Sequence, residues 1–206
     1  METVWIAGAS RGLGAALAHV VSASGCRVVL TARNAPELEK LRTLLPHPEN
    51  AVVAPADLTQ THDLAALVER IWLEHGGIHR AFFCAGLAQW SNPLTTTPAA
   101  EEQLLALNYR FPVQAAKLLA ERMLIQGSGQ LVAVGSIAAE FGQPESAAYG
   151  ASKAALERHW EAYYAAWAHR GLRVQLMQPG VIQTTIMASA LDETGAALGQ
   201  KAAFGV

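Results

Sequence analysis

Two residues with complementary acid–base chemistry, Tyr149 and Lys153, stand four positions apart in a stretch of helical character. At that spacing both side chains lie on one face of a helix, with Cβ atoms about 6 Å apart, so the phenol and the ammonium can act as one unit. Lowering a tyrosine pKa from about 10 to about 7 requires roughly 4 kcal/mol of preferential stabilisation of the phenolate. A neighbouring lysine cation can supply part of it. Because Tyr-x-x-x-Lys also arises by chance, the pair alone gives only a hypothesis of general acid–base catalysis.

A serine hydroxyl is the next candidate. Ser136 ends a strand-like run in Gly135-Ser136-Ile137, thirteen residues before Tyr149. At the carboxyl edge of a sheet, such a hydroxyl can donate a hydrogen bond to the carbonyl oxygen of a substrate. The alternative is that Ser136 only caps a turn.

A glycine-rich turn near the start of the chain predicts a nucleotide site. The strand-like run Thr3–Ala7 leads into Gly8-Ala9-Ser10-Arg11-Gly12-Leu13-Gly14, and Ala15-Ala16-Leu17-Ala18 continues as a helix. Residues without a Cβ permit a tight turn, let the backbone approach a pyrophosphate, and allow the helix to pack near the sheet with its N–H groups toward the anion. Because these glycines stand between a strand and a helix, they indicate a dinucleotide site.

The residue after the second strand indicates which dinucleotide binds. An acidic side chain there would accept the ribose hydroxyls of NAD, but this chain has Arg33. An arginine can hold the 2′-phosphate of NADP by paired charged hydrogen bonds, and Arg11 in the glycine turn adds a second cation. The sequence therefore favours NADP(H) over NAD(H). The alternative is that both arginines are solvated surface residues.

Apolar runs of strand length alternate with helical segments along the chain. The expected strands are Thr3–Ala7, Arg27–Thr31, Ala51–Pro55, His79–Cys84, Leu131–Gly135 and Arg173–Met177. The clearest helices are Glu37–Leu45, Asp63–Glu74 and Tyr149–Trp167. This alternation predicts an α/β fold with a parallel sheet covered by helices on both sides. The longest irregular stretch, Gly86–Pro98, follows the carboxyl end of a strand, where such sheets bind ligands.

Composition restricts the classes of function. The chain has 206 residues, 51% of them hydrophobic, and 15 Lys and Arg against 17 Asp and Glu, so it has no broad attraction for nucleic acid or anionic lipid. Cys26 and Cys84 are interpreted as buried, reduced thiols, and no metal site is expected, since the histidines lack ligand spacing. No apolar run is long enough for a membrane span, and the strand-like N-terminus leaves no room for a cleavable signal, so a cytoplasmic protein is expected.

Taken together, the glycine turn, Ser136 and Tyr149-x-x-x-Lys153 resemble the short-chain dehydrogenase/reductase family, and the resemblance covers almost the whole chain. The further markers of the family follow in order as Asp57-Leu58, Cys84-Ala85-Gly86, Asn108 and Pro179-Gly180. The resemblance implies a Rossmann-type, doubly wound parallel sheet flanked by helices, in one domain over residues 1–206.

The resemblance also implies roles for these residues. Tyr149 is the general acid and base, Ser136 orients the substrate oxygen, Lys153 lowers the tyrosine pKa and binds the ribose, and Asn108 holds a water in a proton relay. The hydride belongs to the cofactor. The expected cofactor-binding residues are Gly8, Ser10, Arg11, Gly12, Leu13, Gly14, Arg33, Asp57, Leu58, Ala85, Gly86, Tyr149, Lys153, Pro179, Gly180, Ile182 and Thr184.

Three features depart from the family pattern. Ala7 stands where a threonine is usual and Cys84 where an asparagine is usual, so hydrogen bonds at the edge of the sheet are lost. Members also continue for some 40 residues beyond Val206, so either a C-terminal segment is missing or the sheet lacks its usual last strand, which would leave an edge to be covered. Residues 184–206 are expected to form a mobile substrate loop and tail.

The sequence supports an NADP-dependent oxidoreductase that interconverts a carbonyl and a secondary alcohol. The alternative is a nucleotide-binding redox sensor or regulator without turnover; epimerase or dehydratase chemistry is disfavoured by the short substrate region. Trp90 either lines the substrate pocket or anchors its loop. On the helix that carries Tyr149, an outward pair of Trp160 and Tyr164 suits a homodimer or homotetramer, although helical aromatics are more often core. No nucleic acid or membrane partner is expected.

Overall fold

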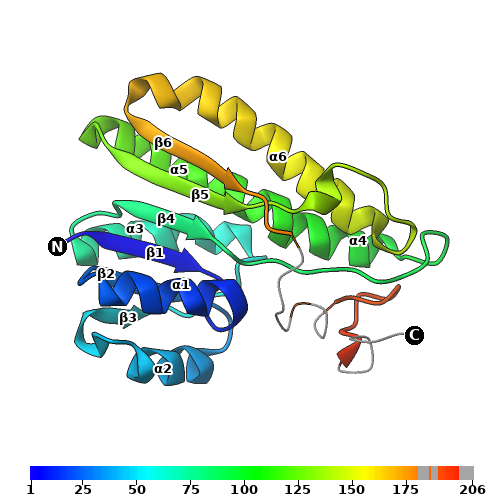
Figure 1. Ribbon diagram of the computed structural model, residues 1–206, viewed down its shortest axis with the longest axis horizontal. Coiled ribbons are helices and arrows are strands. Elements are labelled where there is room, and N and C mark those ends of the chain that lie inside the picture. Colours follow the sequence, from blue (N-terminus) through cyan, green and yellow to red (C-terminus); the bar gives the residue numbers. More distant parts are fainter. Residues whose placement is uncertain (181–185, 187–189, 200–206) are drawn as a thin grey trace.

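The computed structural model describes residues 1–180, 186 and 190–199, and it contains one parallel sheet with helices on both sides (Figure 1). Six strands follow one another in space in the order β3-β2-β1-β4-β5-β6. Every neighbouring pair is parallel. The predicted Rossmann-type α/β class is therefore confirmed. The order reverses between β1 and β4, and at this switch point the carboxyl ends of the strands open a crevice.

The strands and helices have the following bounds: β1 Thr3–Ala7, α1 Gly12–Ala23, β2 Arg27–Thr31, α2 Ala35–Leu44, β3 Ala51–Val53, α3 Leu64–His75, β4 Arg80–Phe83, α4 Pro98–Leu105, α5 Phe111–Gln126, β5 Gly129–Val134, α6 Ala147–Trp167 and β6 Leu172–Met177. A π-helical turn, Ala106–Arg110, joins α4 to α5.

The predicted elements all occur, and their ends move for local reasons. Helix α2 begins before the expected Glu37 because Asn34 caps it: the Asn34 side chain accepts a hydrogen bond from the Glu37 N–H at 3.2 Å. Helix α3 extends to His75 and ends at Gly76, whose φ of 70° favours glycine. Strand β3 ends at Val53, earlier than the expected Pro55.

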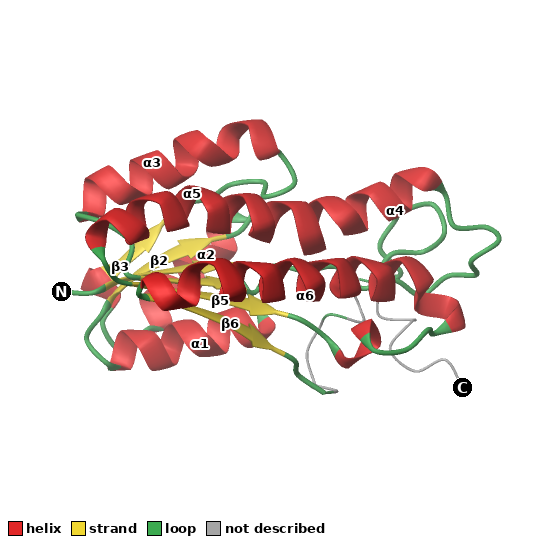
Figure 2. Cartoon of the chain, turned by 90° about the horizontal axis from the view of Figure 1, so that it is seen from above, coloured by secondary structure: helices red, strands yellow, loops and turns green. Residues whose placement is uncertain are grey.

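The apolar core has two parts, one on each face of the sheet. Helices α3, α5 and α6 pack on one face, where Trp5, Phe83 and Leu131 point, and α1 and α2 pack on the other, where Ile6 and Leu30 point. Figure 2 shows α3 and α5 on one side of the strands and α1 on the other. Burial on both faces explains why the strand sequences are almost continuously apolar.

Trp160 belongs to the core and does not form an outward pair with Tyr164. It is 2% exposed, its ring meets Phe83 edge to face at 5.7 Å between centroids, and its Nε1 donates to the Gln175 carbonyl oxygen at 2.9 Å. Tyr164 is 60% exposed. Of the two readings that the sequence left open, the core holds for Trp160 and the outward position for Tyr164; helical spacing alone does not say which face meets the sheet.

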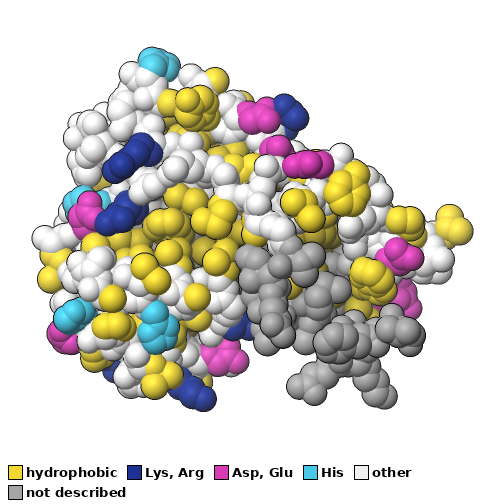
Figure 3. Space-filling model, viewed as in Figure 1, with side chains coloured by type: hydrophobic (Ala, Val, Ile, Leu, Met, Phe, Trp, Pro, Cys, Tyr) yellow, Lys and Arg dark blue, Asp and Glu magenta, His cyan; other side chains and the backbone are white. Residues whose placement is uncertain are grey.

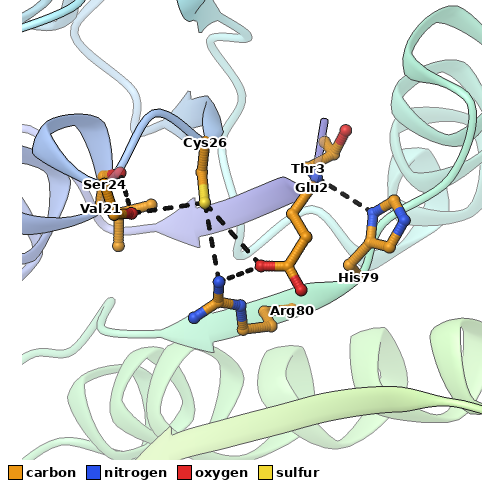
Figure 4. Close-up of polar contacts among 7 residues, drawn as sticks. All are labelled: Glu2, Thr3, Val21, Ser24, Cys26, His79 and Arg80. Carbon is orange, nitrogen blue, oxygen red and sulfur yellow. Dashed lines mark hydrogen bonds and ion pairs between the residues drawn. The ribbon is translucent and has the colours of Figure 1, made fainter.

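A polar cluster ties the amino ends of three strands, at the opposite edge from the crevice (Figure 4). Glu2 and Arg80 form an ion pair, and the Arg80 hydrogen bond lowers the pKa of Glu2. The Cys26 sulfur lies 3.6 Å from an Arg80 nitrogen, and the Thr3 N–H donates to His79 Nδ1 at 3.0 Å. These contacts hold β1, β2 and β4 in register at their starts.

Strand β6 is the edge of the sheet in the described part of the chain. In Figure 1, α1 and α2 cover β1 to β3, and no described helix lies over β5 and β6 on that side. Figure 3 shows hydrophobic side chains gathered on this face. By the strand register, Phe82, Val132 and Gln175 share it with Ile6. None of the described helices is both long and apolar enough to cross a membrane.

The different environments of two aromatic residues on α6 give a first prediction. Trp160→Ala should lower the free energy of unfolding by about 3–5 kcal/mol, because it opens a cavity in the core. Tyr164→Ala should change it by less than about 0.5 kcal/mol, because the side chain is exposed. Urea unfolding of both variants measures this difference. Equal losses would contradict the placement of Trp160 in the core and Tyr164 outside it.

Candidate active site

A cavity of about 730 Å³ opens at the carboxyl ends of the strands. This volume suits a cofactor or other small ligand. Sixteen residues proposed from the sequence line it: Gly8, Ser10, Arg11, Gly12, Leu13, Gly14, Arg33, Asp57, Leu58, Ala85, Gly86, Ser136, Tyr149, Lys153, Pro179 and Gly180. Asn108 lies behind this wall. Ile182 and Thr184 fall outside the described residues.

The glycine turn is held tightly against the neighbouring strands. The Gly8 and Ala9 N–H groups donate to the Thr31 carbonyl oxygen at 2.7 and 3.1 Å. Gly8 has a φ of 90°, and a Cβ there would lie 2.4 Å from the Ala85 nitrogen. A Cβ on Gly14 would lie 2.2 Å from the Gly8 carbonyl oxygen. Only glycine fits at either position, and side chains there would close the approach of the backbone to a ligand.

The start of helix α1 fits an anionic group. The helix begins at Gly12 and has no side-chain cap, and its first turn carries no acidic residue. Its first N–H groups therefore face the cavity beside Ser10 and Leu13, where a pyrophosphate would satisfy them. The residues present thus suit the phosphates of a dinucleotide.

Two arginines line the same end of the cavity. Arg11 comes from the glycine turn and Arg33 from the segment after β2, and Glu37 at the start of α2 also faces this region. Asp57, after β3, accepts hydrogen bonds from the N–H and hydroxyl of Thr59 at 3.0 and 2.8 Å, which fix the orientation of its carboxylate. Two guanidinium groups in the wall of one cavity suit an additional phosphate.

Ser136 and Tyr149 both line the cavity, and the Ser136 hydroxyl lies close enough to the phenol to affect its pKa. Ser136 also caps the 3₁₀ turn Ile137–Ala139, since its Oγ accepts from the Ala138 N–H at 3.2 Å. The turn-capping reading of Ser136 therefore holds, and its place in the cavity wall leaves the donation to a substrate oxygen as a prediction. Burial raises the pKa of Tyr149, and the Ser136 hydroxyl opposes this only in part. In the protein alone, the phenol keeps its proton at neutral pH.

Lys153 lies almost wholly inside the protein, with 4% exposure. Its Nζ donates to the Val134 carbonyl oxygen at 2.8 Å. Burial lowers the pKa of Lys153 to about 8 and raises that of the nearby Cys84 thiol to about 12. In the protein without a bound cofactor, burial raises the phenol pKa, so the lowering of the Tyr149 pKa by Lys153 stays a prediction.

Asn108 lies in the π-helical turn and holds the segment that follows β4. Its Oδ1 accepts from the Leu87 N–H at 2.8 Å, and its Nδ2 donates to the Leu87 carbonyl oxygen at 2.9 Å and to Ser152 Oγ at 3.0 Å. The Ser152 hydroxyl in turn donates to the Tyr149 carbonyl oxygen at 2.7 Å. A Cβ on Gly86 would lie 3.3 Å from Asn108 Oδ1. The relay water expected at Asn108 stays a prediction.

The two departures from the family pattern leave backbone bonds in place. The Ala7 carbonyl oxygen accepts from the N–H groups of Cys84 and Ala85 at 2.8 and 2.9 Å. The ends of β1 and β4 are therefore joined although neither side chain is a good hydrogen-bonding group. Cys84 lines the cavity, and Cys26 lies in the polar cluster; both thiols are free.

The structure also decides the position of Trp90. Its side chain is 50% exposed and is not part of the cavity wall formed by the described residues. Its N–H donates to the Leu191 carbonyl oxygen at 3.0 Å, which favours the reading of Trp90 as a loop anchor. The predicted mobile tail is described at residues 190–199, where it packs on this loop.

Sequence reasoning missed two residues that support Tyr149. A Cβ on Gly150 would lie 2.8 Å from the Ala138 carbonyl oxygen, so this glycine allows α6 to lie against the turn that carries Ser136. A glycine inside a helix was the available signal. Gln89, in the irregular segment, accepts from the Tyr149 N–H at 3.2 Å. Its partners lie far away in sequence, so no local pattern marks it.

Metal chemistry gains no support from the arrangement of side chains. Within residues 1–180, 186 and 190–199, no three His, Cys, Asp or Glu side chains gather closely enough to hold an ion. The described wall of the cavity carries groups that can transfer protons and form hydrogen bonds, among them Ser136, Tyr149 and Lys153.

The amino-acid sequence is similar to a known protein family and to curated proteins. The family model for short chain dehydrogenases matches residues 2–195. A dehydrogenase/reductase SDR family protein 7-like of Anopheles gambiae is 32% identical over 97% of this chain and 65% of its own length. Human dehydrogenase/reductase SDR family member 7 is 31% identical over 91% of this chain and 57% of its own length. The chain thus spans about three fifths of the length of these curated relatives.

Solved structures share the fold. A short-chain dehydrogenase from Sphingobium yanoikuyae in complex with NADPH has a TM-score of 0.85 and 31% identity, covering 92% of this chain and 75% of that one. A metagenomic short-chain oxidoreductase in complex with NADP has a TM-score of 0.83 and 29% identity, covering 87% and 82%.

The close approach at Gly150 gives a second prediction. Alanine normally stabilises a helix by about 1 kcal/mol over glycine. In Gly150→Ala the added Cβ meets a backbone oxygen, so α6 must move and we expect a net loss of about 1–2 kcal/mol in the free energy of unfolding. Gly142→Ala is the control, since a Cβ there meets no atom within 4 Å. Urea unfolding measures both; a stabilised Gly150→Ala would contradict the close packing.

Proposed function

Since this chain belongs to the short-chain dehydrogenase family, we propose that it is an NADP-dependent oxidoreductase that interconverts a carbonyl and a secondary alcohol. The observation that carries the proposal is that Ser136, Tyr149 and Lys153 line the same cavity as the glycine turn. A proton donor and an oxygen-binding hydroxyl next to a nucleotide cradle are the groups that carbonyl reduction needs.

In the proposed reaction, Tyr149 donates the proton of its Oη to the carbonyl oxygen, and it takes a proton back in the reverse direction. Its raised pKa keeps the phenol protonated at neutral pH, as a donor requires. Ser136 donates its hydroxyl hydrogen to the same carbonyl oxygen and orients it. The nicotinamide, when bound, supplies or accepts the hydride.

Lys153 and Asn108 support this pair. Lys153 is proposed to bind the ribose and to stabilise the phenolate, from a position on α6 one turn after Tyr149. With a pKa of about 8, its ammonium is mostly charged at pH 7. Asn108 fixes the backbone of Leu87 and, through Ser152, the start of α6. Its predicted relay of protons toward Lys153 is part of the proposal.

Arg33 and Arg11 are proposed to select NADP(H) over NAD(H). Two cations at the wall of the cavity favour a 2′-phosphate, which carries charge that a bare ribose lacks. Two similar structures were solved with NADP or NADPH, which adds support. Asp57 and Leu58 are proposed to contact the adenine, and Pro179, Gly180, Ile182 and Thr184 the nicotinamide.

The substrate is proposed to be a small carbonyl or alcohol compound. The predicted cytoplasmic location and the homodimer or homotetramer stay predictions made from the sequence. The alternative of a redox sensor without turnover would gain support if the full-length protein bound NADPH tightly yet oxidised none across a panel of ketones, aldehydes and quinones.

The proton donor gives a third prediction. Tyr149→Phe should lower turnover by a factor of at least about 100, the usual scale for a positioned proton donor. Because the nucleotide cradle is unchanged, the Kd for NADPH should stay within about threefold. Steady-state kinetics and fluorescence titration measure the two quantities. Tyr164→Phe, on the same helix but exposed, is the control, and unchanged turnover in Tyr149→Phe would remove this residue from its role.

The phosphate assignment gives a fourth prediction. Arg33→Asp should weaken NADPH binding by at least about tenfold while NADH binding changes little, because the lost charge pair involves only the 2′-phosphate. Titration of the variant with each nucleotide measures the ratio of the two Kd values. An equal loss for both nucleotides would refute the role of Arg33 in selecting the cofactor.

A further inference from the structure

We propose that Gln89 is a positioning residue, which caps helix α6 from outside and holds the backbone of Tyr149 in place. The proposal rests on the proposed function, because Tyr149 is the proton donor there. Gln89 touches the helix start and not the cavity: its side chain does not line the wall formed by the described residues. It therefore acts through Tyr149 and is not itself catalytic.

The cap is made by the side-chain oxygen of Gln89. Oε1 accepts hydrogen bonds from the Ala148 N–H at 3.0 Å and from the Tyr149 N–H at 3.2 Å. These are the second and third residues of α6, which begins at Ala147. The N–H groups of a first turn have no partner within the helix, and an N-cap side chain normally supplies the acceptor for them.

The residue at the usual capping position has another bond. Ser146 precedes α6 but makes no side-chain cap. Its hydroxyl donates instead to the Gln89 carbonyl oxygen at 2.9 Å. The two residues thus exchange roles: the serine binds the glutamine backbone, and the glutamine side chain caps the helix.

The orientation of the Gln89 amide follows from its neighbours. Nε2 donates to Ser91 Oγ at 2.8 Å and to Thr96 Oγ1 at 3.1 Å, while Oε1 faces two N–H donors. A flipped amide would set its NH₂ group against the helix N–H groups, so only this orientation satisfies all partners. The side chain is 2% exposed, and such a buried group resists displacement.

Gln89 also meets the segment 190–199 through its backbone. It forms a parallel bridge with Leu191. On either side of it, the Leu191 N–H donates to the Ala88 carbonyl oxygen at 2.9 Å, and the Trp90 N–H donates to the Leu191 carbonyl oxygen at 3.0 Å. One residue therefore joins the segment 190–199, the loop after β4 and the start of α6.

Loss of the Oε1 acceptor should act on the chemical step more than on nucleotide binding. Without it, two buried N–H groups at the start of α6 lose their partner, and the first turn can shift with Tyr149 on it. The glycine turn, Arg33 and Asp57, which are proposed to hold the nucleotide, come from other elements. A small displacement of a proton donor can cost a large factor in rate.

The test compares Gln89→Met with Gln89→Glu. Methionine has a similar length but no acceptor, so kcat should fall at least about tenfold. Hydrogen exchange at the Ala148 and Tyr149 amides should accelerate, while the Kd for NADPH stays within about threefold. Glutamate retains the acceptor, and the Ser91 hydroxyl can turn to donate to its second oxygen, so most of kcat should return. Gln114→Met, the same replacement on an exposed residue of α5, is the control.

The outcomes separate the two proposals. If the wild-type protein turns over and Gln89→Met keeps its kcat, or if Gln89→Glu loses as much kcat as Gln89→Met, the positioning role is refuted. If the wild-type protein reduces no carbonyl compound, the proposed function fails. Amide exchange in Gln89→Met then tests the cap by itself: faster exchange at Ala148 and Tyr149 supports it, and unchanged exchange refutes it. If Gln89→Met does not fold, hydrogen exchange is measured on Gln89→Glu instead. Protection of the Ala148 and Tyr149 amides in that variant supports the cap, and loss of their protection refutes it.

Discussion

The hydrogen bond from Lys153 Nζ to the Val134 carbonyl oxygen is the interaction on which the arrangement of the cavity depends. It joins helix α6 to the end of strand β5. Tyr149 lies one turn before Lys153, and Ser136 follows Val134 by two residues. The contact between Lys153 and Val134 therefore also brings Tyr149 near Ser136. A buried ammonium needs an acceptor, since its desolvation is costly. The main-chain oxygen supplies that acceptor without adding a second charge.

The same burial moves the two acid–base groups in opposite directions. It raises the pKa of Tyr149 and lowers that of Lys153 to about 8. The phenol is therefore a proton donor at neutral pH, and the ammonium is charged below pH 8 and loses its charge above it. The protein alone thus sets the phenol in its acid form. Any lowering of the phenol pKa must then come from positive charge near its oxygen, either from the Lys153 ammonium, whose field is screened less inside the protein than in water, or from a bound ligand.

Local patterns allowed much of this arrangement to be predicted from sequence. Strand β1, the glycine turn and Tyr149 with Lys153 follow from spacing within a few residues, and the structure keeps them together around one cavity. Long-range packing was not accessible in the same way. The burial of Trp160 depends on which face of α6 meets β6 and Phe83. The raised phenol pKa depends on enclosure by other elements, and the contacts of Gln89 reach across 57 to 60 residues.

The contacts around α6 show why its first turn can be placed accurately although the loop beside it is irregular. Gly150 lets the helix approach the Ala138 carbonyl oxygen, Ser152 binds the Tyr149 carbonyl oxygen, and Gln89 binds the Tyr149 N–H. These contacts come from the Ser136 turn, from α6 itself and from the loop after β4. Their directions differ, so a displacement of the turn that relieves one of them strains another. Because Gln89 also bridges Leu191, the position of the segment 190–199 and that of the phenol are not independent. Gln89 thus links the segment 190–199 to the backbone of the residue that carries the phenol.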